Sequence, residues 1–228
     1  MLRIARGVFR RARSFVTPGP ERFLRNVRGV IHVGANAGQE RDLYQQHGLH
    51  VIWIEPIPEV FEQLEANLRG YPRQRAFQYL VTDADDKEYA FHISNNEGQS
   101  SSILALKLHK DIWPDVTFTK SLALRSITLP SLLRKEGIDI GNYNALVMDT
   151  QGSELLVLEG AAPILPRLKF VKTEVSDFES YEGCCQLEEM NRFLGQHGFR
   201  ERYRNPFARR AEGGIYYDVT YERVGSRT

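Results

Sequence analysis

Short apolar runs alternate with helix-like stretches along most of the chain. Runs typical of buried strands occur at residues 30–33, 51–54, 76–81, 145–148 and 170–175. Helical patterns lie between them, and the run at 215–224, in which apolar and polar residues alternate, predicts one more strand. This order is typical of an α/β protein, in which helices cover both faces of a mostly parallel sheet.

The regular spacing breaks after the third predicted strand. Residues 88–93 predict an extra strand, and Ser94 to Lys120 is long, polar and rich in serine at its start. A long insertion in a compact domain is usually a lid or a substrate loop. We therefore predict a lid at about residues 94–126 within a domain that spans residues 21–228.

Residues 1–20 form a separate basic segment, in which five arginines alternate with apolar residues and no acid precedes Glu21. At helical spacing, residues 1–17 are suited to lie on an anionic membrane surface, here the inner face of a membrane. An Arg-rich transit peptide has the same pattern. A leading helix that packs loosely on the domain, or a frayed end, explains the segment equally well.

Composition narrows the class of protein. With 228 residues, 42% of them hydrophobic and 26% charged, the chain suits one soluble domain. The net charge of +1 gives no reason to expect a nucleic-acid partner. The only cysteines, Cys184 and Cys185, are neighbours that rarely form a disulfide, which favours a reducing, cytoplasmic location. No apolar run approaches the length of a membrane span.

The first predicted strand ends in the small-residue loop Gly34-Ala35-Asn36-Ala37-Gly38. Small residues let a backbone approach a ligand closely, and a helix N-terminus offers free N–H groups to a carboxylate. S-adenosylmethionine (SAM) carries such a carboxylate. Glu55, at the end of the second strand, is placed to accept hydrogen bonds from two ribose hydroxyls.

A dinucleotide such as NAD is bound through the same two features, so the spacing of the glycines must distinguish NAD from SAM. Its fingerprint, Gly-x-Gly-x-x-Gly, lets the backbone contact a pyrophosphate. This chain has Asn36 and Gln39 at the second and third glycine positions, and both side chains would crowd a pyrophosphate. SAM has no pyrophosphate, so the loop favours SAM, although a tight strand–helix turn without a ligand would look similar.

Several segments of the chain resemble the FkbM family of SAM-dependent methyltransferases. The resemblance spans roughly residues 28 to 200 and is carried by residues 30–38, 55–56, 60–68, 148–161, 174–176 and 181–183. It implies a class I methyltransferase fold, a Rossmann-like seven-stranded sheet with an antiparallel last strand. It also implies O-methylation of sugar or natural-product hydroxyls. Two positions depart from the family pattern, since His32 stands where aspartate is frequent and Gln151 where glutamate is common.

Two carboxylates are the predicted catalytic residues. Asp149 lies at the end of the fourth predicted strand and Glu174 near the end of the fifth, and ligands of open α/β sheets sit beyond the carboxyl ends of strands. A carboxylate there can take the proton of the attacking hydroxyl, with Asp149 the first candidate and Glu174 the second. Mg²⁺ on Asp149, Glu174 and Asp177 is a less favoured alternative. Capping of the helix near Ser153 is the structural alternative for Asp149.

The remaining site predictions concern the donor and other side chains. The residues predicted to bind SAM are His32, Gly34, Ala35, Asn36, Gly38, Glu55, Pro56, Thr82 and Asp149. For Glu154 we expect only a favourable interaction with the helix dipole. His92 and His109 flank the insertion and are candidate bases, but a lone loop histidine is more often solvated. A basic loop with Arg204, Arg209 and Arg210 is a candidate phosphate site, though a solvated loop is the simpler interpretation.

These observations favour a SAM-dependent O-methyltransferase acting on a small molecule or glycan, such as a lipid-linked or nucleotide-linked sugar. One alternative is a nicotinamide-dependent oxidoreductase. The other is a methyltransferase-like fold that binds SAM without turnover, which the changes at His32 and Gln151 would permit.

Overall fold

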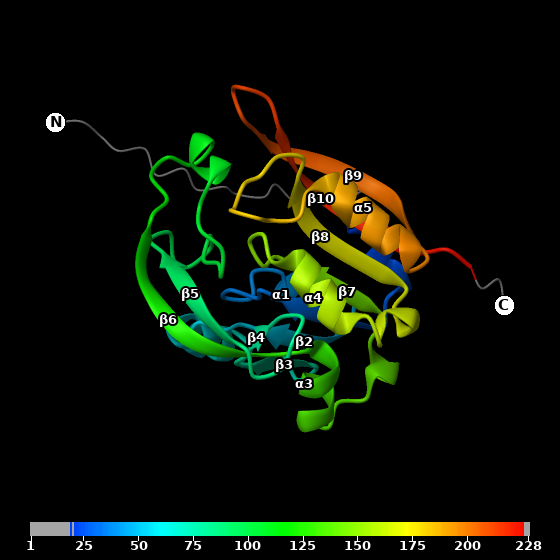
Figure 1. The fold of residues 1–228 in the computed structure, drawn as a ribbon. Helices are drawn as coiled ribbons and strands as arrows, with labels where there is room; N and C mark the ends of the chain where they lie inside the picture. Colours follow the sequence, from blue (N-terminus) through cyan, green and yellow to red (C-terminus); the bar gives the residue numbers. More distant parts are fainter. Residues whose placement is uncertain (1–18, 20, 226–228) are drawn as a thin grey trace.

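Seven strands form one sheet in a computed structural model that describes residue 19 and residues 21–225 (Figure 1). The strands are β1 (Gly29–Val33), β2 (His50–Ile54), β3 (Gln74–Phe77), β7 (Ala145–Met148), β8 (Phe170–Ser176), β9 (Phe199–Arg209) and β10 (Ile215–Arg223). Their order is β3-β2-β1-β7-β8-β10-β9. β10 is antiparallel to both of its neighbours, whereas the other neighbouring pairs are parallel. The predicted fold class is confirmed, and the segment 1–17 lies outside the described residues.

Helices cover both faces of this sheet. One face carries a short 3-10 helix η1 (Arg22–Asn26), α1 (Arg41–Gln46) and α2 (Pro58–Asn67), whose proline occupies the first turn. The other face carries α3 (Leu129–Lys135), α4 (Glu154–Ala161) and α5 (Leu187–Gln196). Short 3-10 helices complete the fold: η2 (Leu108–Asp111), η3 (Ile140–Asn142) and η4 (Leu165–Arg167).

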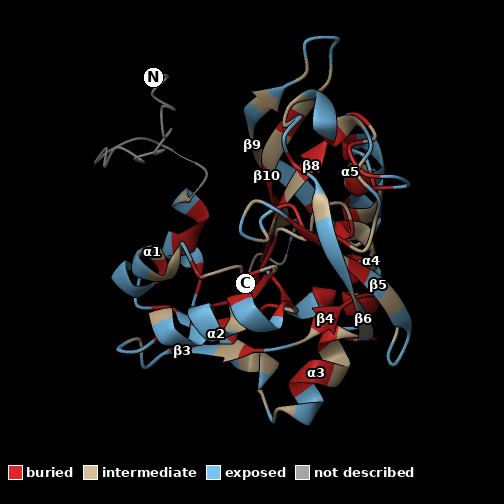
Figure 2. Cartoon of the chain, turned by 90° about the vertical axis from the view of Figure 1, so that its left-hand side faces the viewer, coloured by how far each residue is buried: buried red, intermediate tan, exposed pale blue. Residues whose placement is uncertain are grey.

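Alternation along the central strands divides the core between the two faces. In β1, Ile31 packs with Leu132 and Leu158 on one side, while Val30 packs with Tyr44 and other residues on the opposite side. All five residues of β1 are buried, as expected for a parallel strand covered on both faces. Figure 2 shows buried residues concentrated in the sheet and on the helix faces turned toward it.

A second, three-stranded sheet accounts for the predicted insertion. It contains β4 (Leu80–Val81), β5 (Glu88–Ser94) and β6 (Phe118–Ile127) in the order β4-β6-β5. The single strand predicted at 76–81 is therefore wrong, because the chain divides between β3 and β4 of two different sheets. The loop predicted up to Lys120 is also too long, since β6 begins at Phe118. The side chains of β6 are mostly exposed, so its sequence shows little of the apolar alternation that predicts a strand.

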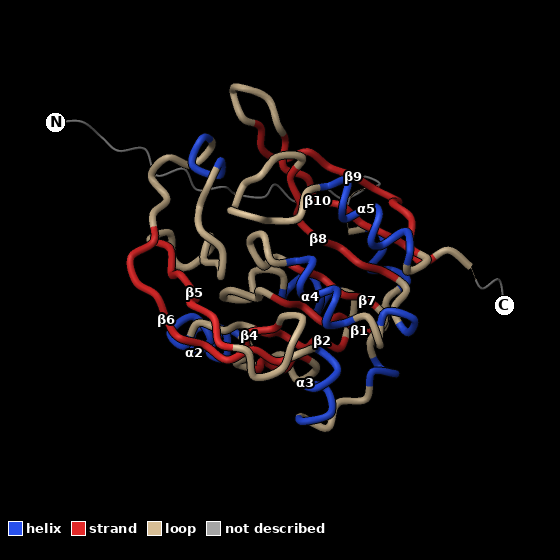
Figure 3. Tube along the Cα trace, in the orientation of Figure 1, coloured by secondary structure: helices blue, strands red, loops and turns tan. Residues whose placement is uncertain are grey.

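The loop that joins β5 to β6 crosses toward the loop after β8. The backbone N–H of Lys107 donates to Ser180 O at 3.0 Å, and Leu106 forms an antiparallel bridge with Tyr181. Figure 3 shows these loops gathered at the centre of the molecule, between the β5–β6 hairpin and β8. The predicted insertion thus covers one end of the large sheet.

The basic loop predicted near the C-terminus is wrong, because Arg204 and Arg209 belong to β9 and Arg210 follows it directly. β9 is an edge strand with mostly exposed side chains, so it lacks the apolar alternation that marks a strand. Arg204 pairs with Glu201, and Arg210 pairs with Asp111. Within the described residues, no helix is both long and apolar enough to cross a membrane.

Candidate active site

A cavity of about 400 Å³ opens where the connections of the sheet change direction. β2 and β3 lie on one side of β1 in the sheet. The chain then crosses to the other side of β1, where β7 lies. The loops after β1 and β7 meet here, and the N–H of Asp149 donates to Val33 O at 3.0 Å. Such a switch point is the usual ligand site of open α/β sheets.

The loop after β1 closes tightly against the loop after β7. Gly34 has a φ of +79°, and a Cβ there would lie 1.9 Å from the carbonyl oxygen of Asp149, so only glycine fits. The N–H groups of Gly34 and Ala35 both donate to Ile54 O. This contact holds β1 and β2 together at the floor of the cavity.

The amides of this loop are not free, which corrects one expectation from the sequence. The N–H of Asn36 donates to Glu55, that of Ala37 to Asn36 Oδ1, and that of Gly38 to Ala35 O. Helix α1 begins only at Arg41, after a turn. A ligand carboxylate would therefore have to find its donors beyond residues 34–38.

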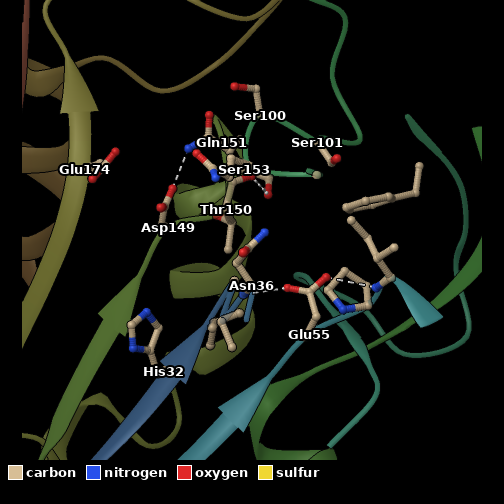
Figure 4. A pocket seen from close by; sticks show the side chains of 18 of the residues that line it. His32, Asn36, Glu55, Ser100, Ser101, Asp149, Thr150, Gln151, Ser153 and Glu174 are labelled. Atoms are coloured by element: carbon tan, nitrogen blue, oxygen red, sulfur yellow. Dashed lines mark hydrogen bonds between the residues drawn. The ribbon is translucent and has the colours of Figure 1, made fainter. Parts of the chain in front are cut away.

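Glu55 joins the first two strands at the cavity. Its Oε2 accepts from the Asn36 N–H at 2.8 Å and its Oε1 from the Ile57 N–H at 2.9 Å (Figure 4). The side chain is 4% exposed, and burial raises its pKa to about 7, while the two backbone hydrogen bonds oppose that shift. A carboxylate has about four acceptor positions, so two remain for ligand hydroxyls.

Asp149 and Glu174 line the cavity from the ends of the neighbouring strands β7 and β8. Burial raises the pKa of both carboxyl groups, and the negative charge of Asp149 raises the pKa of Glu174 further. The Nε2 group of Gln151 donates to Asp149 Oδ1 and favours the ionised form of Asp149 (Figure 4). Asp149 does not cap α4, so the structural alternative for this residue is wrong.

His32 lies in the floor of the cavity and is 5% exposed. Its Nδ1 is 3.1 Å from the Tyr44 hydroxyl, and its ring stacks on Trp53 with centroids 4.8 Å apart. Burial lowers its pKa to about 4, so the ring is neutral at pH 7. The histidine thus replaces the frequent aspartate with an uncharged polar group.

Some of the other predicted residues line the cavity, and others lie outside it. Pro56 lines the cavity, but Gly38 and Thr82 do not, and the Thr82 hydroxyl contacts Ala84 O instead. Glu154 accepts from the N–H groups of Thr150 and Gly152 and braces the loop after β7, a structural role.

The metal alternative receives no support from the position of Asp177. Its carboxylate accepts from Ile215 N–H and the Tyr217 hydroxyl, outside the cavity. In the part of the chain that the structure describes, no three Asp, Glu, His or Cys side chains are grouped to hold a metal ion.

Several lining residues escaped prediction. The insertion contributes Ser100, Ser101 and Trp113, and β9 and β10 contribute Phe207 and Tyr216. His109 also lines the cavity and is 3% exposed, so the expectation of a solvated loop histidine is wrong. A tryptophan in a polar insertion and an aromatic residue on an otherwise basic strand were the available signals.

Acidic side chains dominate the charge of the cavity. Its lining includes four carboxyl side chains, those of Glu40, Glu55, Asp149 and Glu174, and no lysine or arginine among the described residues. A pyrophosphate would be repelled here, whereas a cationic ligand would be attracted. The positively charged sulfur of SAM meets this condition.

Comparison with known proteins agrees with the geometry. Residues 32–201 match the Methyltransferase FkbM domain. The 2-O-methyltransferase NoeI of Sinorhizobium fredii (strain NBRC 101917 / NGR234) is 27% identical over 166 residues, 69% of this chain and 67% of that protein.

Solved structures share the fold at low sequence identity. An uncharacterized protein from Listeria monocytogenes serotype 4b has a TM-score of 0.52 at 8% identity and covers 94% of this chain and 70% of its own. M. capricolum TrmK, solved with S-adenosyl-homocysteine, has a TM-score of 0.51 at 6% identity over 92% of this chain and 69% of its own.

The fold and the site define a SAM-dependent methyltransferase. The chain belongs to the FkbM methyltransferase family. The oxidoreductase and non-catalytic alternatives are therefore set aside.

Proposed function

We propose that this enzyme transfers a methyl group from SAM to a hydroxyl oxygen of a carbohydrate or natural product. The observation that carries the proposal is the acidic cavity at the switch point, where Asp149 and Glu174 line the same space as the loops after β1 and β2. The similarity to a protein named as a 2-O-methyltransferase supports oxygen as the acceptor atom.

Glu55 is the residue best suited to hold the ribose. Each of its oxygens already accepts one backbone N–H, which fixes the carboxylate at the rim of the loop after β1. The remaining acceptor position on each oxygen matches the two hydroxyls of a ribose. Binding of those hydroxyls favours the ionised form of Glu55 and so lowers its raised pKa.

Side chains around the loop close off space that a pyrophosphate would need. Gln39 Nε2 donates to Asn36 Oδ1 at 2.9 Å, and Asn36 Nδ2 donates to Glu97 O of the insertion at 3.2 Å. These contacts fill the region over the loop with amide groups. They support a donor without phosphate groups.

SAM supplies a methyl carbon on a cationic sulfur when it is bound. The ionised carboxylate of Asp149 favours that positive charge in a buried cavity. The cavity walls would hold the acceptor hydroxyl beside the donor, and alignment of two reactants supplies much of the acceleration of such reactions.

Asp149 takes the hydroxyl proton as the oxygen attacks. Two neighbouring buried carboxyl groups disfavour joint ionisation, so one holds a proton near neutral pH. The Gln151 hydrogen bond favours ionisation of Asp149, which leaves Glu174 as the protonated partner. Glu174 can then donate a hydrogen bond to the acceptor, while Asp149 acts as the general base.

Methyl transfer from labelled SAM tests the proposal. Variants Asp149→Asn and Glu174→Gln should lose methyl transfer, with Asp149→Asn falling about 100- to 10,000-fold. Asp177→Asn is the matched control, because Asp177 directly follows β8, the strand that carries Glu174, but does not line the cavity. Full activity of both Asp149→Asn and Glu174→Gln would refute the assigned roles.

The acceptor can be sought in cells. Mass spectrometry of glycans and small metabolites from cells with and without the gene should show a product that is one methyl group lighter without it. Calorimetric titration with SAM and with NAD checks the donor, and tighter binding of NAD would contradict the proposal.

A further inference from the structure

An aromatic wall forms one side of the cavity. It consists of His109 and Trp113 from the β5–β6 loop, Phe207 from β9 and Tyr216 from β10. The ring centroids of His109 and Trp113 are 4.6 Å apart, those of Trp113 and Tyr216 are 5.4 Å apart, and those of Phe207 and Tyr216 are 5.6 Å apart. Two distant parts of the chain therefore meet in one continuous aromatic surface.

The wall contains polar atoms without partners. Neither ring nitrogen of His109 makes a hydrogen bond to a described residue, and its Nδ1 is fully buried. The Tyr216 hydroxyl is also buried, but it lies near Ser180, which does not line the cavity. Because polar groups inside proteins are normally paired, the unpaired ring of His109 indicates a site that a ligand completes.

Phe207 gives a second, independent indication. Its side chain is 42% exposed, and among the described residues only Val224 is another large hydrophobic side chain exposed to this degree. An exposed aromatic side chain at the edge of a cavity suits contact with an apolar ligand surface.

Neither Arg210 nor His109 offers an unpaired positive charge at the aromatic wall. Arg210, next to this end of β9, pairs with Asp111 at 2.5 Å, lies over the Phe178 ring and has a side chain that is 11% exposed. Burial lowers the pKa of His109 to about 4, so the ring is uncharged at neutral pH. With no lysine or arginine among the described lining residues, an anionic acceptor would meet only the four carboxyl groups.

We propose that the aromatic wall is the acceptor subsite and that it binds an uncharged, saturated pyranose-type ring bearing several hydroxyls, without a phosphate on that ring. The apolar face of the ring packs on Trp113 and Phe207, and its hydroxyls pair with the ring of His109. Ser100 and Ser101 offer further polar groups in the same cavity. This inference rests on the proposed transfer to a hydroxyl oxygen.

Ligand-observed NMR with the full chain and saturating S-adenosyl-homocysteine tests the subsite. The probes are the methyl pyranosides of glucose, galactose, mannose and xylose, together with glucose 6-phosphate and catechol. At least one pyranoside should show saturation transfer, and Trp113→Ala and Phe207→Ala should each reduce it about fivefold or more. Val224→Ala is the matched control, since it removes exposed apolar surface from the far end of the β9–β10 pair.

His109→Phe separates binding from folding. The ring nitrogens of His109 have no partner, so replacing the imidazole with an apolar ring should leave the unfolding midpoint unchanged or higher. The same variant should weaken pyranoside binding several-fold. No binding by any pyranoside, stronger binding of glucose 6-phosphate or catechol, or unchanged binding in the Trp113 and Phe207 variants would each overturn the subsite. Failure of SAM to bind in a separate titration would instead overturn the proposed function.

Discussion

The side chain of Gln151 links Asp149 to Tyr181. Its Nε2 donates to Asp149 Oδ1, and its Oε1 accepts from the Tyr181 hydroxyl at 2.6 Å. The main-chain oxygen of Gln151 also accepts from Ser102 of the insertion at 2.7 Å. The glutamine therefore orients the candidate base and ties it to the lid, and it adds no further negative charge to a cavity that already has four carboxyl groups.

Gln151→Glu should move the acid limb of the pH–rate profile upward. A new carboxylate beside Asp149 replaces a donor with a like charge, which raises the pKa of Asp149 further. Because Asp149 must be ionised to accept a proton, the rate rises with pH through that pKa. We expect a shift of about one pH unit in kcat/KM, and a smaller shift in Gln151→Ala, which removes the donor without adding charge. Identical acid limbs in all three proteins would contradict the role of Gln151.

Patterns of apolar residues predicted the large sheet because its central strands are buried on both faces. β7 was predicted at residues 145–148, where the structure has it, and β10 was predicted to within one residue. β6 and β9 were missed because their side chains are largely exposed, so local hydrophobicity carries little information about them. Only pairing with β5 and β10 makes them strands.

Residues at or near the carboxyl ends of strands could be placed in the site, because these ends meet at one edge of a parallel sheet. Glu55, Asp149 and Glu174 all line the cavity for this reason. The partners of these residues could not be found in the same way. Trp113 and Tyr216 are far apart in sequence and meet only through the folding of the insertion over the sheet.

SAM should bind more tightly as pH rises toward neutrality. Burial raises the pKa of Glu55 to about 7, and ribose hydroxyls donate to its ionised form. Affinity should therefore increase about 30-fold between pH 5.5 and 8 if Glu55 alone is linked to binding. Calorimetric titration across this range measures the effect.

Glu55→Gln supplies the comparison for that measurement. The variant should bind SAM about 10- to 100-fold more weakly at pH 8 and lose most of the pH dependence. Glu59→Gln, an exposed change in the first turn of α2, should behave as wild type. A wild-type affinity that does not change with pH would show that Glu55 is not the linked group.

Alanine at three glycines should give graded losses of stability. Gly183 has a φ of +70° and open space around it, so Gly183→Ala should lower the free energy of unfolding by about 1–2 kcal/mol. At Gly38 the Cβ would lie 2.7 Å from the flexible end of Leu64, and at Gly34 it would lie 1.9 Å from main-chain oxygen. Urea unfolding should give the order Gly183, Gly38, Gly34, with the Gly34 variant losing more than about 3 kcal/mol. Equal losses would show that backbone conformation alone matters.

His32 should make the protein sensitive to mild acid. Burial lowers its pKa from 6.5 to about 4, so the unfolded chain binds the proton more readily than the folded one. The stabilisation is complete above pH 6.5 and is lost as pH falls toward 4, with about 2 kcal/mol lost between pH 8 and pH 5. In His32→Asn, which keeps a polar group near Tyr44 but cannot titrate, this loss should be missing. The test is the difference between the two proteins in the pH dependence of urea unfolding, because groups such as Glu55 titrate in both. Parallel pH dependences would mean that His32 is already accessible to protons in the folded state.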